Sequence, residues 1–269
     1  MITAEQLCSY HENGYLIIED AIEPDSLPAL QQAYEEAIGR ALELGHAARD
    51  PETGFLNGHR FQNPHHPDLA KPALLDSLVA EPVMQFCRGL AGPTLAFYGL
   101  AAFAMQPEFD YLGQWHRDAY AAWGKDSETE RAVREIHSWP CTQVLLAIED
   151  DACFWVVPGS HNRPNTEEEE RKFEEGETGW EEIFPGAIQT RLKAGTAVPF
   201  DARSIHRGLK RPGTSRRSIF FVYGPPRELK HTGVTAWAKD PAYRNPEYLA
   251  SLPSALRTAM ELTQAYVSP

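Results

Sequence analysis

The chain has 269 residues, of which 42% are hydrophobic and 10% aromatic, so it can bury a sizeable core in one domain spanning residues 1–269. No apolar run is long enough to span a bilayer, and the first residues lack the basic and apolar regions of a secretion signal, so we expect a cytoplasmic protein without a membrane partner. The net charge of −13 argues against nucleic acid as a partner, because phosphate binding needs a basic surface.

The N-terminal part, about residues 1–93, is predicted to be mainly helical. Thr3 is placed to cap a short helix through His11 that ends at Gly14, and residues 15–18 have the composition of a strand. A longer helix is expected after Pro24-Asp25-Ser26, with apolar residues at helical spacing as far as Leu44.

A loop is expected over residues 45–67, because this stretch is rich in Gly, Asn, Pro and His. We expect its His59, His65 and His66 to be exposed. Residues 69–90 are predicted to form two helices with a break near Glu81-Pro82.

Strands are predicted to dominate residues 94–224, and the tail of residues 225–269 is expected to be irregular, with a late helix over residues 253–266. The chain has no internal repeat and no long linker. This order of elements predicts a mainly β fold with flanking helices.

An acidic segment, residues 167–182, contains nine Glu against one Arg and one Lys. Charge runs of this kind usually form a solvated surface helix. The alternative is that residues 167–186 form a lid over a catalytic site.

The four cysteines, Cys8, Cys87, Cys141 and Cys153, show neither a Cys-x-x-Cys motif nor zinc-binding spacing. We expect them to be reduced thiols, as is usual in the cytoplasm.

The clearest chemical signal is His116-Arg117-Asp118, combined with a distant His206. On a β-strand, residues i and i+2 point to the same side, so His116 and Asp118 can bind one ion while Arg117 points away. Two imidazoles and one carboxylate are the facial triad of non-haem Fe(II) oxygenases. A hydrogen-bonded strand pair is the plain alternative for His116 and Asp118 alone.

The residues after His206 strengthen the metal hypothesis. A turn at Pro212-Gly213 leads into an apolar run over residues 219–223, which is typical of a buried strand. Arg216 and Ser218 can both face inward there, although a one-residue slip would place Arg217 inside instead. An inward guanidinium beside an iron triad suggests a dicarboxylate ligand, of which 2-oxoglutarate is the simplest. Gln143 is either a cosubstrate contact or a structural amide.

Four pieces of the sequence resemble the phytanoyl-CoA dioxygenase-like Fe(II)/2-oxoglutarate oxygenases, and the resemblance runs from the N-terminus to about Tyr223. The pieces are Trp115-His116-Arg117-Asp118, then Val156-Val157-Pro158-Gly159-Ser160-His161, then His206-Arg207-Gly208, and Arg216-Arg217-Ser218. The chain departs from the family pattern at Asp151-Ala152, where an Asn-Gly pair is common, and at Leu145, where a Trp is common; both positions are expected near the cavity.

The resemblance implies a double-stranded β-helix core of the jelly-roll, cupin-like kind. It also implies that His116, Asp118 and His206 bind Fe(II), that Arg216 holds 2-oxoglutarate with Ser218 and Gln143 nearby, and that O₂ is the oxidant. The Pro-Gly-Ser-His element is a turn in this family, not an iron ligand.

These features predict an oxygenase that hydroxylates a small metabolite and releases succinate and CO₂. An acyl-CoA hydroxylase, the same chemistry giving desaturation or cyclisation, and an inactive ligand-binding β-helix protein remain alternatives. Monomer and homodimer are both open. The candidate substrate contacts are Arg60, Gln62, Trp123 and Trp155.

Overall fold

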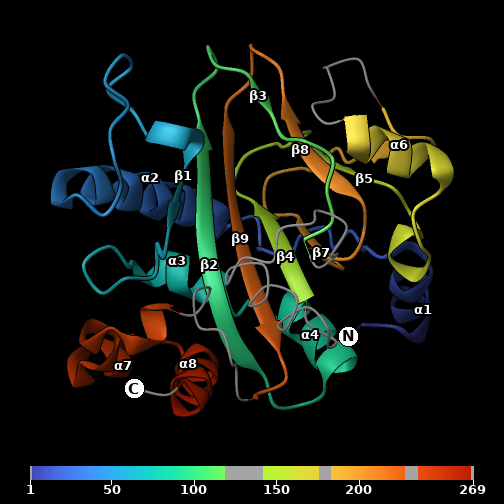
Figure 1. The fold of residues 1–269 in the computed structure, drawn as a ribbon. Helices are drawn as coiled ribbons and strands as arrows, with labels where there is room; N and C mark the ends of the chain where they lie inside the picture. The colour runs from blue at the N-terminus through green and yellow to red at the C-terminus, as the bar shows by residue number, and fades with distance from the viewer. Residues whose placement is uncertain (1, 119–141, 176–182, 228–235, 268–269) are drawn as a thin grey trace.

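Two antiparallel sheets form the centre of the molecule in a computed structural model that describes residues 2–118, 142–175, 183–227 and 236–267 (Figure 1). The larger sheet has the order β1-β2-β9-β4-β7, with β1 Arg60–Gln62, β2 Ala96–Met105, β9 Arg216–Gly224, β4 Thr142–Ala147 and β7 Ala197–Phe200. The smaller sheet has the order β3-β8-β5-β6, with β3 Tyr111–Leu112, β8 His206–Lys210, β5 Phe154–Val156 and β6 Ile188–Gln189. The predicted β region with flanking helices is therefore confirmed, and its sheets are antiparallel, but the fold is mixed α/β and not mainly β, because the flanking helices are as extensive as the sheets.

Strand β9 lies in the middle of the larger sheet, paired with β2 on one side and β4 on the other. Side chains alternate along a strand, and Ile219, Phe221 and Tyr223 accordingly pack into the core beneath the helices. The other face of the strand carries Arg216 and Phe220, which line an internal cavity.

Hydrophobic residues fill a second core, located between the two sheets. Its buried members come from β4, β5 and β7 and from one connecting residue: Leu145, Ala147, Phe154, Val156, Leu192, Val198 and Phe200. The molecule is thus layered as helices, large sheet and small sheet, and the cavity lies between the sheets.

The helices are α1 Ala4–Asn13, α2 Leu27–Leu44, α3 Pro72–Ser77, α4 Glu81–Ala91, α6 Glu167–Glu175, α7 Pro246–Ser251 and α8 Ser254–Tyr266. Short 3-10 helices cover Asn57–His59, Ser160–Asn162, Ala236–Lys239 and Pro241–Arg244. Figure 1 shows α2 and α3 beside the β1 edge of the larger sheet and α8 beside one end of β2.

The helix boundaries predicted for the N-terminal part are confirmed. The Thr3 hydroxyl accepts a hydrogen bond from the Gln6 amide at 3.2 Å, and the Gln6 side chain accepts one from the Thr3 amide at 2.9 Å. Gly14 ends α1 with a φ of 78°, which favours glycine. Helix α4 begins at Glu81, and Pro82 in its first turn accounts for the predicted break.

Helix α2 is attached to the back of the larger sheet through Tyr34. Its hydroxyl oxygen lies 2.7 Å from the Phe103 carbonyl oxygen on β2 and 3.2 Å from the Ser218 carbonyl oxygen on β9. Phe103 and Ser218 are register partners, so α2 holds the two central strands at one position.

The structure corrects four expectations. Residues 60–62 form the edge strand β1 inside the expected loop, and residues 15–18 make only the isolated bridges Tyr15–Phe200 and Ile18–Ala197. The tail contains α7 in addition to the late helix α8. Of the three loop histidines expected to be exposed, His65 is fully buried against Phe97 and Trp237, and His59 and His66 are half-buried.

The acidic segment begins as a helix, α6, whose described residues end at Glu175. Its Glu169 is buried and receives two hydrogen bonds from Arg163, at 2.7 and 2.8 Å. Residues 176–182 lie outside the described part of the chain, and the lid remains a hypothesis.

Three of the cysteines are free thiols, Cys8 exposed and Cys87 and Cys153 buried, whereas Cys141 lies outside the described residues. Burial raises the pKa of Cys153 to about 12. Among the described residues, no helix has the length and apolar character that crossing a membrane requires.

Candidate metal centre

Backbone pairing brings the two halves of the predicted triad together. The main-chain amides of His116 and His206 each donate to the other's carbonyl oxygen at 2.9 Å, and the Asp118 amide donates to Ala202 at 2.9 Å. The extended backbone directs His116 and Asp118 to the same side, toward His206. Arg117 points away, as predicted, and donates to the Asn165 side chain at 2.8 Å.

The potential ligand atoms of the triad are close enough for one ion. His116 Nε2 lies 3.2 Å from Asp118 Oδ1, and His206 Nε2 lies 3.5 Å from Asp118 Oδ2. Ligand atoms bound at about 2.0–2.2 Å to one octahedral ion would be about 3 Å apart. The three side chains therefore fit a single metal ion with little movement.

Both histidine rings are oriented by backbone carbonyls on the side away from the site. His116 Nδ1 lies 2.7 Å from the Gln114 carbonyl oxygen, and His206 Nδ1 lies 2.9 Å from the Ser204 carbonyl oxygen. Each Nδ1 therefore carries the hydrogen, which leaves both Nε2 lone pairs available to a metal.

The Asp118 carboxylate is oriented by Gln143 on β4, whose amide donates to Asp118 Oδ2 at 2.6 Å. Burial lowers the pKa of His116, but hydrogen bonding and the charge of Asp118 raise it by more, so the pKa lies above its usual value. A metal ion binding here competes with that proton.

The cavity at the triad extends between the sheets and has a volume of about 240 Å³. Its wall opposite the triad includes Arg216, whose side chain is 2% exposed. Gly208 makes room for this arrangement, since a Cβ at that position would lie 3.0 Å from Tyr111 Cε1 and 3.4 Å from Arg216 Nη1.

Arg216 is held by a buried ion pair. Its Nε lies 3.0 Å from Asp151 Oδ2, and both side chains are almost completely buried. The other oxygen of Asp151 accepts from the Cys153 amide at 2.6 Å. Asp151 is the position where the chain departs from the family's Asn-Gly pattern. Because its carboxylate binds Nε of Arg216, the Nη groups of Arg216 remain for the cavity.

The two residues after Arg216 lie on opposite faces of β9. Arg217 points toward α2, where its Nε lies 2.5 Å from Glu35 Oε1. Ser218 shares the face of Arg216, and its buried hydroxyl has no hydrogen-bond partner within the described part of the chain. A buried polar atom in this state fits a site built for a ligand.

The predicted substrate contacts are dispersed. Arg60 lines the triad cavity, whereas Gln62 lines a separate pocket that contains His46 and His66. Trp155 lies on the outer face of the smaller sheet under Arg207, and Trp123 lies outside the described residues.

Sequence reasoning missed two residues that line the triad cavity, Arg207 and Tyr111. Arg207 is fully buried, with its guanidinium 4.6 Å from the ring centre of Trp115. The position of Arg207 directly after His206 indicates a residue near the triad. The sequence does not show that its guanidinium stacks on the rings of Trp115 and Trp155.

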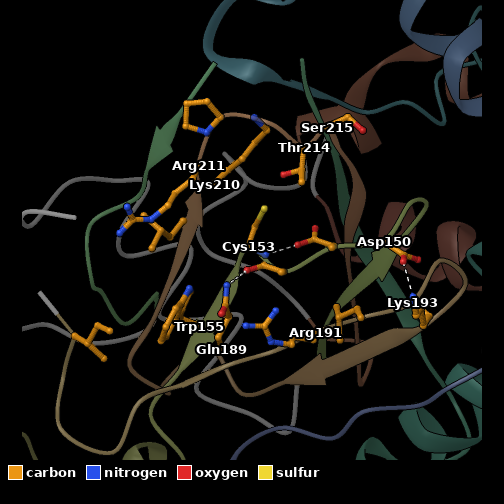
Figure 2. A pocket seen from close by; sticks show the side chains of 16 residues that line it. Asp150, Cys153, Trp155, Gln189, Arg191, Lys193, Lys210, Arg211, Thr214 and Ser215 are labelled. Atoms are coloured by element: carbon orange, nitrogen blue, oxygen red, sulfur yellow. Dashed lines mark hydrogen bonds and ion pairs between the residues drawn. The ribbon is translucent and has the colours of Figure 1, made fainter. Parts of the chain in front are cut away.

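A larger cleft, with a volume of about 730 Å³, lies beyond the Arg216–Asp151 pair. Figure 2 shows Arg191, Lys210 and Arg211 around it, with Lys193 paired to Asp150. Asp151 lines this cleft while Arg216 lines the triad cavity, so the ion pair separates the two spaces.

Two antiparallel sheets with flanking helices, enclosing a His-x-Asp…His cluster, define the class of cupin-like Fe(II)/2-oxoglutarate enzymes. The family comparison agrees: the phytanoyl-CoA dioxygenase model matches residues 10–218. The chain belongs to this family, whose members are Fe(II)/2-oxoglutarate-dependent oxygenases, as the sequence predicted. No curated protein matches the chain.

Solved structures with the same fold share little sequence with the chain. The apo form of EctD from S. alaskensis has a TM-score of 0.63 at 20% identity, over 87% of this chain and 81% of that one. The epimerase SnoN, in complex with Fe3+, alpha ketoglutarate and nogalamycin RO, has a TM-score of 0.58 at 18% identity, over 88% and 89%. EvdMO1 has a TM-score of 0.59 at 18% identity, and the match covers 82% of this chain but only 50% of EvdMO1.

Proposed function

We propose that the chain is a hydroxylase that binds Fe(II) through His116, Asp118 and His206, anchors 2-oxoglutarate at Arg216, and oxidises a small metabolite. One observation carries this proposal. Three metal-ligating atoms meet at one part of a cavity whose wall also holds a buried guanidinium.

The anchor fits a dicarboxylate. Asp151 occupies only Nε of Arg216, so the Nη groups remain for a bidentate contact with a carboxylate. The Ser218 hydroxyl on the same face of β9 can donate to that carboxylate, which would satisfy its missing hydrogen bond. When bound, iron and 2-oxoglutarate supply the oxidising chemistry, with succinate and CO₂ as co-products.

The residues of the chain contribute orientation and the exclusion of water. Gln143 fixes the Asp118 carboxylate, and the backbone carbonyls fix the two imidazoles. The rings of Phe103, Phe154 and Phe220 line the cavity with apolar surface. Charged groups interact more strongly in such a dry site, which favours tight positioning of an anion.

We further propose that the two sheets form a double-stranded β-helix within a single domain, residues 1–269. Small-molecule ligands in the structural neighbours support a free metabolite as the substrate: EctD was crystallised with 2-oxoglutarate and 5-hydroxyectoine, and SnoN with nogalamycin RO. SnoN is an epimerase, so the same cofactors also permit outcomes other than hydroxylation.

An acyl-CoA substrate is the second candidate, because the larger cleft carries Arg191, Lys193 and Arg211. These cations suit the phosphates of coenzyme A. The Arg216–Asp151 pair nevertheless separates this cleft from the triad, and this arrangement favours the free metabolite.

Succinate release across a panel of free metabolites and acyl-CoA esters tests the proposal. We expect succinate formation with a free metabolite and a product that has gained one oxygen; loss of two hydrogens would indicate desaturation or cyclisation. Under anaerobic conditions, Fe(II) with 2-oxoglutarate should give a weak visible absorption band. A folded protein that shows neither the band nor succinate would refute the oxygenase assignment.

A further inference from the structure

A second group of metal-ligating side chains lies outside the triad cavity. His46, His66 and Asp68, here called the surface cluster, each offer one ligand atom, and these atoms all lie within 4.8 Å of one another. His46 and His66 also line a separate pocket of about 310 Å³, which shares no lining residue with the triad cavity.

The distances in the surface cluster match those between ligands of one tetrahedral ion. His46 Nε2 lies 3.4 Å from Asp68 Oδ2, and His66 Nδ1 lies 3.6 Å from the same oxygen. Zinc ligands bound at about 2.0–2.1 Å would be about 3.3–3.4 Å apart at the tetrahedral angle. Both Asp68 contacts are within a few tenths of an ångström of this spacing, and the two imidazole nitrogens lie within 4.8 Å of each other.

Hydrogen bonding sets the tautomer of His66 that a metal needs. The Asp68 main-chain amide donates to His66 Nδ1 at 3.2 Å, so this nitrogen is the unprotonated one, and an ion bound to its lone pair would replace this hydrogen bond. The hydrogen is then on Nε2, which lies 4.0 Å from Asp240 Oδ2. A carboxylate behind a histidine is the usual outer support of a metal ligand.

The backbone on both sides of the surface cluster is well fixed. His65, the residue before His66, is buried among aromatic rings, and its carbonyl accepts from the Tyr248 hydroxyl at 2.5 Å. His46 follows Gly45, which ends α2 with a φ of 77°, and the next amide, of Ala47, donates to Ala41 at 3.2 Å. Ligands on such fixed backbone lose little conformational entropy when they bind.

We propose that the surface cluster binds a divalent transition-metal ion, with Zn²⁺ as the best match. Two imidazoles and one carboxylate with an open fourth position are a donor set that zinc uses in proteins. Asp240, whose Oδ2 lies 4.0 Å from His66 Nε2, adds a negative charge behind that ring. The ion would connect the end of α2 with the turn after β1, and through Asp240 with the C-terminal segment.

The test uses tag-free protein in which His116→Ala and Asp118→Ala remove the first site. Titration with Co²⁺, followed by visible absorption, should show one bound ion with a tetrahedral spectrum, and Zn²⁺ should displace it. Adding His46→Ala or Asp68→Asn should each weaken Co²⁺ binding by at least about 100-fold, because a ligand matters more than an outer partner. Asp240→Asn should weaken it by about 10-fold.

His59→Asn is the matched control. His59 lies in the same loop outside the surface cluster, and Asn tolerates its positive φ of 59°. This control should leave Co²⁺ affinity unchanged. If the double variant binds no Co²⁺, or if His46→Ala and Asp68→Asn both bind it as tightly as the control, the second site does not exist. Circular dichroism of each variant shows that a loss reflects the ligands and not the fold.

Discussion

The same donor set, two histidines and one aspartate, occurs twice in the described part of this molecule and is built in two ways. In the triad, two paired backbone segments bring His116, Asp118 and His206 together between the sheets. In the surface cluster, three ligands come from the end of a helix and a turn, and the side chain of Asp68 is 57% exposed. Backbone pairing through an isolated bridge fixes the first, and tertiary packing of irregular segments fixes the second.

The two groups also differ in what holds their ligands. Backbone carbonyls orient both triad imidazoles, and a buried amide orients the carboxylate. In the surface cluster, the main-chain amide of Asp68 orients one imidazole, and solvent reaches the carboxylate. A buried and fully oriented site suits chemistry, whereas a partly exposed one suits a structural ion.

The largest effect should come from Asp118→Ala. We expect succinate formation to fall by roughly 1,000-fold or more, because metal-dependent transition-state stabilisation is lost. The free energy of unfolding should change little. His46→Ala should leave turnover within about twofold; a comparable loss in both variants would mean that the two clusters are not independent.

Arg216→Lys should raise the KM for 2-oxoglutarate by about 100-fold, equivalent to about 3 kcal/mol, because lysine cannot make the bidentate contact. Steady-state kinetics at varied 2-oxoglutarate measures this. Arg217→Lys is the matched control on the opposite face of β9, and it should change the KM by less than about twofold. The reverse pattern would place the cosubstrate elsewhere.

Gln143→Leu should weaken Fe(II) binding by about 10-fold, since the Asp118 carboxylate loses the amide that orients it. Iron titration with single-turnover succinate as the readout measures this. Addition of excess iron should restore most of the rate. A rate that stays low at saturating iron would instead indicate that Gln143 contacts a substrate.

The smallest effect is expected from Asp151→Asn, which keeps the shape of the partner of Arg216 but removes its charge. We expect the KM for 2-oxoglutarate to rise by about fivefold with kcat unaffected. The reason is that the hydrogen bond that holds the Arg216 guanidinium in place is weakened by about 1 kcal/mol. Asp150→Asn is the neighbouring control, since its exposed ion pair with Lys193 adds little. Equal KM values for both variants would show that Asp151 does not position Arg216.

Local patterns predicted the helices and the central strands well. The Thr3 cap, the Gly14 end of α1 and the break before α4 depend on neighbouring residues, which the sequence displays directly. The short strand β1 could not be predicted, because its three residues pair only through contact with β2. The burial of His65 likewise depends on Trp237, which is distant in sequence.

The triad residues were predictable as a group because extended backbone places His116 and Asp118 on the same side, although the structure has an isolated bridge at His116 in place of the expected strand. The ion pair between Asp151 and Arg216 was not predictable, since it joins the turn after β4 to the start of β9. The surface cluster was missed for the same reason. His66 and Asp68 share one turn, but His46 approaches them only through the packing of α2.

The central position of β9 has a consequence for biosynthesis. Strands β2 and β4 are synthesised before β9 but are not adjacent in the sheet. Both pair with β9, which ends at Gly224, so the sheet can form only after β9 has been synthesised. Such non-local pairing is slow compared with local helix formation. A ribosome-bound chain that stops short of β9 would therefore contain its N-terminal helices but would lack the triad cavity. Iron would then bind only after nearly the whole polypeptide has been synthesised.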